Sequence, residues 1–215
     1  MSRRRGEGII TKQNFPKPLR MRLEMKNWIG KTLLMTLGLS SVATPCYCQD
    51  DGSKLEAYSG VAIGTGGTVG GRSVPFDIRI TRYNTDQEVQ KFAELLKASG
   101  PDALRRALEK EDVGRLNPAG SVGNQIAIAR KRQVGQDTII RIVTARIMPF
   151  MELYRSGRSV DYPFGYLELK LNAKDPGTGV IMAAANIRFN KKKGQYEIES
   201  YGNQYIKATN VRPMK

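Results

Sequence analysis

Histidine is absent from this 215-residue chain, and cysteine occurs only twice, at Cys46 and Cys48. Histidine is the commonest general base and the commonest metal ligand, so its absence removes the most frequent catalytic and metal-binding arrangements. Residues 49–215 contain no cysteine, which excludes a disulfide, a thiolate nucleophile and a cysteine-based zinc site there. Neither Ser-x-x-Lys nor Gly-x-Ser-x-Gly occurs. We therefore expect no cofactor, and the sequence gives no support for an enzyme.

Long apolar runs and acidic residues are also scarce. No stretch approaches the roughly 18 apolar residues of a membrane-spanning helix, while 40% hydrophobic and 26% charged residues are ordinary for a globular protein. Lys and Arg number 35 against 20 Asp and Glu. Residues 1–48 hold nine of the basic and two of the acidic residues, which leaves a net charge of +8 on residues 49–215. This balance favours an anionic partner such as an envelope component.

Residues 1–48 contain the three parts of a secretory signal peptide. Lys26 and Lys31 precede the apolar run from Leu33 to Leu39, and small residues follow it. We expect cleavage before Thr44 or before Gln49, and hence a periplasmic or secreted protein without a transmembrane segment after cleavage. The preceding residues do not suit a signal peptide, so Met21 or Met25 is the expected true start, with a disordered basic tail as the alternative. Export argues against nucleic acid as a partner.

Residues 49–215 are expected to form a single antiparallel β domain. Apolar and polar residues alternate over 74–81, 167–171 and 181–189, the period of a half-buried strand. The segments 125–130, 138–145, 196–201 and 204–209 are further expected strands, and Asn190 to Gly194 is typical of a hairpin loop. With about eight strands in short succession, we expect a mainly β (α+β) fold whose sheet curls into a barrel or half-barrel.

The period changes in an insert over 85–110, after the second strand of the domain. Thr85 to Glu88 has the sequence of a capping box, and Val89, Phe92 and Leu96 follow at helical spacing. Pro101 interrupts this pattern. The insert is therefore expected to be a helical hairpin or a broken helix that packs against the sheet.

Residues 60–72 are rich in glycine but do not match a phosphate-binding loop. Such a loop precedes a helix, whereas the residues that follow, 74–81, have the period of a strand. We interpret the segment as a hairpin loop with glycines at positive φ and at bulges.

Two groups of side chains are candidate binding residues. Basic clusters at 130–132 and 191–193 lie at expected strand ends or turns, where solvated charge is usual. The second group combines rings with guanidinium groups, which together can line a ligand pocket. Its members, the predicted ligand-binding residues, are Tyr154, Arg155, Arg158, Tyr162, Phe164 and Tyr166. On a strand the last three rings would share one face, with Leu167 and Leu169 on the other.

The order of two strands, helices and further strands is similar to that of helix-grip lipid-binding domains of the START type. Those domains end in a long C-terminal helix, whereas this chain ends in the strand-like segment 205–209. The leading hypothesis is an exported, non-enzymatic barrel that binds a small apolar or amphipathic ligand. The alternative is a cell-envelope interaction protein that uses basic turns and strand edges. The second alternative is a hydrolase or isomerase without His or Cys, for which Asp77, Asp161 and Glu168 would be the available carboxylates.

Overall fold

Eleven strands and one helix form the described part of a computed structural model, residues 20–22, 55–65, 71–150, 161–172, 174–201 and 206–214. In chain order they are β1 (Arg20–Arg22), β2 (Glu56–Gly64), β3 (Ser73–Ile80), α1 (Asp86–Leu108), β4 (Gly114–Pro118), β5 (Asn124–Ile126), β6 (Ile128–Val134), β7 (Asp137–Thr144), β8 (Phe164–Asn172), β9 (Gly177–Asn190), β10 (Gln195–Ser200) and β11 (Ile206–Pro213).

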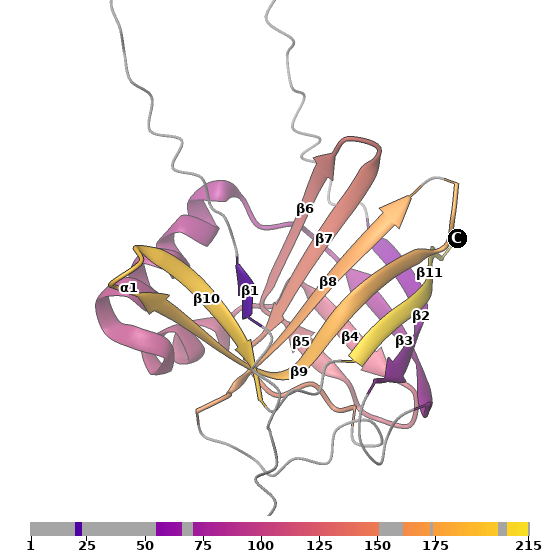
Figure 1. Ribbon diagram of the computed structural model, residues 1–215, viewed down its shortest axis with the longest axis horizontal. Helices are drawn as coiled ribbons and strands as arrows, with labels where there is room; N and C mark the ends of the chain where they lie inside the picture. Colours follow the sequence, from indigo (N-terminus) through magenta and orange to yellow (C-terminus); the bar gives the residue numbers. More distant parts are fainter. Residues whose placement is uncertain are drawn as a thin grey trace, which may run out of the picture.

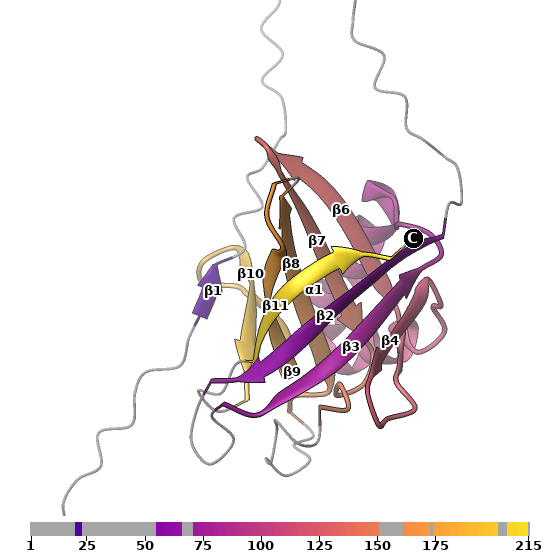
Figure 2. The ribbon, with the colours of Figure 1, turned by 90° about the vertical axis from the view of Figure 1, so that its right-hand side faces the viewer.

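The strands form one antiparallel sheet that is nearly closed into a barrel (Figures 1 and 2). Its order is β5-β4-β3-β2-β11-β9-β8-β7-β6. Strands β5 and β6 stand at opposite ends of this order, yet only Ala127 separates them in the chain. Because β5 pairs with β4 and β6 pairs with β7, one bent segment joins the two ends of the sheet. The C-terminal half of β9, residues 185–190, pairs with β10, and β10 pairs with β1.

Alternating side chains fill the inside of this barrel. Along β3, Val74, Phe76, Ile78 and Ile80 are buried, as the period of two predicts. Leu167 and Leu169 of β8 belong to the same cluster, which confirms the predicted core face of that strand. Other members contributed by neighbouring strands are Ala62, Leu116, Ile126, Ile140, Ile142, Ile181 and Ala208. The described interior is therefore a packed apolar core.

Helix α1 lies beside the sheet, next to β10 (Figure 1). A second apolar layer lies between this helix and the sheet, outside the barrel. Leu96, Leu104 and Leu108 are the buried residues of the helix. They share a cluster with residues from β8, β9 and β10, namely Phe164, Tyr166, Met182, Ala185 and Ile198. The sequence correctly placed Leu96 on the buried stripe, whereas Phe92 is only partly buried at its margin.

The insert is one kinked helix, so the predicted hairpin is not confirmed. The capping box is present: the Glu88 amide donates to Thr85 Oγ1 over 3.2 Å, and the Thr85 amide donates to the Glu88 carboxylate over 2.7 Å. Gly100 has φ of 81°, a conformation that glycine adopts without steric cost. This residue bends the helix directly before Pro101, and the chain continues helically to Leu108 instead of reversing.

Three segments differ from their expectations, and the first is 125–130, which was expected as one strand but contains the end of β5 and the start of β6. Residues 60–64 belong to β2 instead of a loop, while residues 66–70 of the glycine-rich segment lie outside the described residues. A Cβ on Gly60 would lie 2.8 Å from Cζ of Phe76. Gly60 is thus required for close packing against Phe76. The predicted positive φ is found at Gly71, where φ is 80°. Strand β4 was not predicted at all.

Candidate functional site

The predicted aromatic–arginine site is described only in part. Tyr154, Arg155 and Arg158 lie outside the described residues. Tyr162 precedes β8 and packs against the interior core, where its ring meets that of Tyr201 edge-on, with centroids 5.1 Å apart. The ligand-binding role of this group therefore stays a prediction.

Phe164 and Tyr166 lie on the outer face of β8, in the layer covered by α1. Both are almost completely buried. Burial, followed by the negative charge of Glu168, raises the pKa of Tyr166 above its ordinary value. The Tyr166 hydroxyl donates to Glu168 Oε2 over 3.0 Å, and Arg141 Nε donates to the same oxygen over 2.7 Å. These two rings thus contribute to the packing between helix and sheet.

A polar cluster spans one mouth of the barrel. The hydroxyls of Tyr58 and Tyr83 each donate to Glu56 Oε2 over 2.6 Å, and Lys131 Nζ donates to Glu56 Oε1 over 2.7 Å. The Lys131 ammonium also lies 5.6 Å from the centroid of the Tyr83 ring. Glu56 begins β2 and Lys131 lies on β6, two strands that are not neighbours in the sheet. The cluster therefore connects the start of β2 to β6, the last strand in the sheet order.

The protonation states in this mouth cluster follow from its geometry. Burial alone would raise the pKa of Glu56, but the hydrogen bonds from Lys131, Tyr58 and Tyr83 outweigh it and hold that pKa below its ordinary value. Burial, and then hydrogen bonding to Glu56, raises the pKa of both tyrosines. At neutral pH Glu56 is accordingly a carboxylate, and Tyr58 and Tyr83 are phenols.

The second polar feature is the edge of β6, the last strand in the sheet order. The Asn84 amide donates to the Ala129 carbonyl over 2.9 Å, and the Ala129 amide donates to Asn84 Oδ1 over 2.8 Å. Both backbone groups of Ala129 thus point away from β7. Because this direction alternates along an antiparallel strand, the N–H and C=O groups of Lys131 and Gln133 point to the same side. No strand of the described residues pairs with β6 on that side.

The side chains of this edge carry positive charge. Arg130 donates to the Asn84 carbonyl and pairs with Asp86, and Lys131 is paired with Glu56. Arg132 is exposed and makes no ion pair with the described residues. Val134, at the end of the strand, is 54% exposed. The solvated charge predicted for 130–132 therefore applies fully to Arg132 only.

The structure also places the other predicted charged groups. Lys191 to Gly194 form the turn between β9 and β10, as predicted, and Lys193 pairs with Glu197 over 3.1 Å. Glu168 is engaged by Arg141 and Tyr166, and it lies on β8, whereas Asp77 lies on β3. Among the described residues no group of three or more metal-ligating side chains could hold a metal ion.

In the described part of the chain, no helix has the length and apolar character needed to cross a membrane. No protein-family model matches the sequence, and no curated protein or solved structure is significantly similar to it.

Proposed function

We propose that this protein is a non-enzymatic interaction module that takes an extended, acidic segment of a partner protein as an added strand on β6. The observation that carries the proposal is the Asn84 contact. It provides both hydrogen bonds that a neighbouring strand would make to Ala129 and leaves the next two outward positions, Lys131 and Gln133, for a partner. Strand addition to a sheet edge is a common mode of peptide recognition.

Charge and exposure favour an acidic segment with alternating apolar residues. Side chains of an added strand alternate between the two faces of the sheet. On the outer face they would lie beside Arg132, where a carboxylate would find a guanidinium group that has no ion pair within the described residues. Gln133 and the mouth cluster lie on the other face. Leu55, the residue before Glu56, is 61% exposed, which favours apolar residues on this face of the added strand. A second copy of β6 would instead oppose basic residues to basic residues, which is unfavourable.

The proposed binding surface is the edge of the sheet at β6, and not the inside of the barrel. A small apolar ligand, the leading hypothesis from the sequence, would need interior space. The described interior positions are occupied by core side chains such as Phe76, Ile142 and Leu169, each 2% exposed or less.

Gln133→Pro tests the proposal, with Gln133→Ala as its matched control. Both variants lose the hydrogen bonds of the Gln133 side chain to Gly135 and Thr138. Only proline also removes the outward N–H, which makes no bond to β7 and whose loss an edge strand tolerates. The probe is the peptide acetyl-Glu-Val-Glu-Val-Glu-Val-amide. We expect Gln133→Pro to bind it at least about fivefold more weakly than Gln133→Ala, which corresponds to one hydrogen bond of about 1 kcal/mol.

Isothermal titration calorimetry measures both affinities, and a peptide with Lys in place of each Glu controls for charge. Equal affinities of the two variants, or equal binding of the acidic and basic peptides, would refute recognition at this edge.

We further propose that the module acts outside the cytoplasm, because Leu33 to Leu39 and their flanking residues have the order of a signal peptide. N-terminal sequencing of the natural protein should then begin at Thr44 or Gln49. Recovery of an intact N-terminus from the cytosol would contradict export. Strand β1 precedes both expected cleavage sites, so the mature protein would lack it and the β10 edge with which it pairs would be uncovered.

A further inference from the structure

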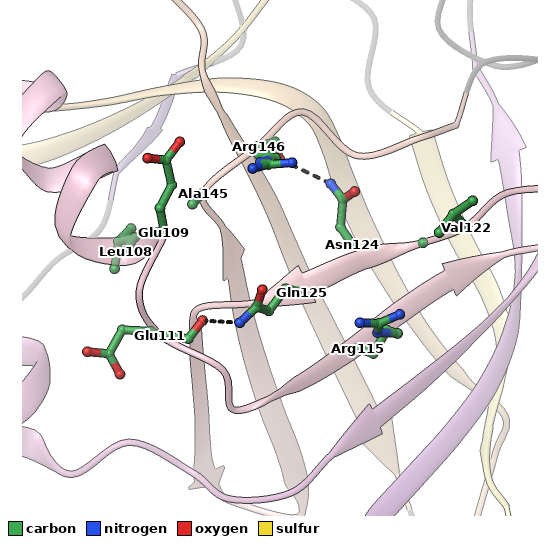
Figure 3. Close-up of a pocket in the computed structure, with 10 residues that line it drawn as sticks. Leu108, Glu109, Glu111, Arg115, Val122, Asn124, Gln125, Ala145 and Arg146 are labelled. Carbon is green, nitrogen blue, oxygen red and sulfur yellow. Dashed lines mark hydrogen bonds between the residues drawn. The ribbon is translucent and has the colours of Figure 1, made fainter.

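A cleft of about 220 Å³ opens beside α1 and β5, and no residue of β6 lines it (Figure 3). It lies between the end of α1, strands β4 and β5, and the segment that follows β7. Its polar side chains are Glu109, Glu111, Arg115, Asn124, Gln125 and Arg146, and Leu108, Val122 and Ala145 provide apolar surface. In Figure 3, Arg146 lies in the upper part of the view and Arg115 in the lower part, with Asn124 and Gln125 between them.

The carboxylates of the cleft are already engaged. Glu109 Oε1 lies 2.6 Å from Arg105 Nη1, and Glu111 Oε2 lies 3.5 Å from Arg82 Nη2. Neither Arg105 nor Arg82 lines the cleft. The negative charges of Glu109 and Glu111 are thus paired with arginines that do not line the cleft.

The arginines of the cleft are not engaged in this way. The guanidinium groups of Arg115 and Arg146 make no ion pair with any of the described residues. Arg115 also lies directly opposite Arg79 in the pairing of β3 with β4, and like charges at such positions repel. An anion held between Arg115 and Arg146 would offset this repulsion.

The amide side chains are fixed so that they border the cleft. Asn124 Nδ2 donates to the Ile147 carbonyl over 2.7 Å, and Gln125 Nε2 donates to the Glu111 carbonyl over 2.9 Å. These bonds connect β5 to the segments on either side of the cleft, the second of them drawn in Figure 3. Its walls are therefore positioned by the fold before any ligand binds.

We propose that this cleft binds a small molecule through an oxyanion, a phosphate or carboxylate group, held by Arg115 and Arg146. A planar guanidinium group matches both kinds of oxyanion with two parallel hydrogen bonds. The volume is below the roughly 300–1,000 Å³ of sites for drug-sized molecules, which restricts the ligand to a small one. The adjoining Leu108 and Ala145 would contact a short apolar portion. This site is independent of the strand addition proposed for β6.

Titrations with inorganic phosphate and with acetate, followed by ¹H–¹⁵N NMR at constant ionic strength, test the site. At least one of the two anions should shift the amide signals of Gly123, Asn124, Gln125 and Arg146 in a saturable way. Arg115→Gln and Arg146→Gln should each weaken that binding by about tenfold or more, the loss expected for a hydrogen bond between charged groups. Lys207→Gln, which removes the same charge from β11, should leave the affinity unchanged.

The response to phosphate or to acetate alone would support the site and assign its chemical class. The absence of saturable shifts with both anions would overturn the proposal. An equal loss of affinity in Lys207→Gln would also overturn it, because binding would then reflect net charge instead of the cleft.

Discussion

Phe76→Ala is expected to lower the free energy of unfolding by about 3–5 kcal/mol, the range for removal of a buried phenylalanine ring. Phe76 is 2% exposed and points into the barrel from β3. Its ring meets Phe150 edge-on with centroids 6.2 Å apart, and Gly60 of the neighbouring strand makes room for it. The substitution would leave a cavity that these neighbours cannot fill without moving the backbone.

Urea denaturation followed by circular dichroism measures this change. Ser73→Ala is the matched control, because Ser73 lies on the same strand but is exposed, and it should change stability by less than about 0.5 kcal/mol. If Phe76→Ala and Ser73→Ala had equally small effects, the interior of the barrel would not be the close-packed core described here.

Glu56→Ala is expected to cost about 2–4 kcal/mol, because the two phenols and the ammonium group of the mouth cluster lose their shared acceptor. Tyr58 is only 5% exposed, so its hydroxyl cannot recover a full water contact. Glu56→Gln keeps an acceptor oxygen but removes the charge, and a smaller loss is expected. An effect below about 0.5 kcal/mol for Glu56→Ala in the same urea titration would show that the cluster does not stabilise the fold.

The same cluster predicts the sign of a pH dependence. The pKa of Glu56 is lowered in the folded protein relative to its ordinary value of 4.5. The carboxylate therefore contributes stability that is fully present above about pH 4.5 and is lost as pH falls through the folded pKa. The stability difference between the parent protein and Glu56→Gln should accordingly shrink below about pH 4.5. A difference that grows on acidification would contradict this sign.

The sequence predicted most strands because their periodicity is local. Alternation over 74–81 and 167–171 identifies β3 and β8 without any knowledge of their neighbours. Strand β4 was missed because its five residues, from Gly114 to Pro118, begin with glycine and end with proline, both typical of turns. Its extended conformation is fixed by pairing with β3 and β5, which are tertiary contacts.

The start of α1 could be predicted from local sequence, but its path beyond Gly100 could not. The capping box identified its start correctly, since Thr85 and Glu88 are three residues apart. Whether the chain reverses or continues at Gly100 depends on packing beyond it, where Leu104 and Leu108 join the outer apolar layer. No local signal distinguishes these two outcomes.

The polar features were not predictable because their residues are far apart in the sequence. Glu56 binds Tyr83 across 27 residues and Lys131 across 75. Asn84 binds Ala129 across 45 residues, and an asparagine just before a helix is more often read as part of its cap. The basic run at 130–132 was visible in the sequence, but its position on the last strand of the sheet was not.

Amide hydrogen exchange, measured residue by residue with NMR, tests the proposed strand addition most directly. In the protein alone, the outward N–H groups of Lys131 and Gln133 should exchange rapidly, whereas those of Arg130 and Arg132, which face β7, should be protected. Saturation with acetyl-Glu-Val-Glu-Val-Glu-Val-amide should slow exchange at Lys131 and Gln133 by about tenfold or more and change little at Arg130 and Arg132. Binding of the peptide with unchanged exchange at Lys131 and Gln133 would contradict the account.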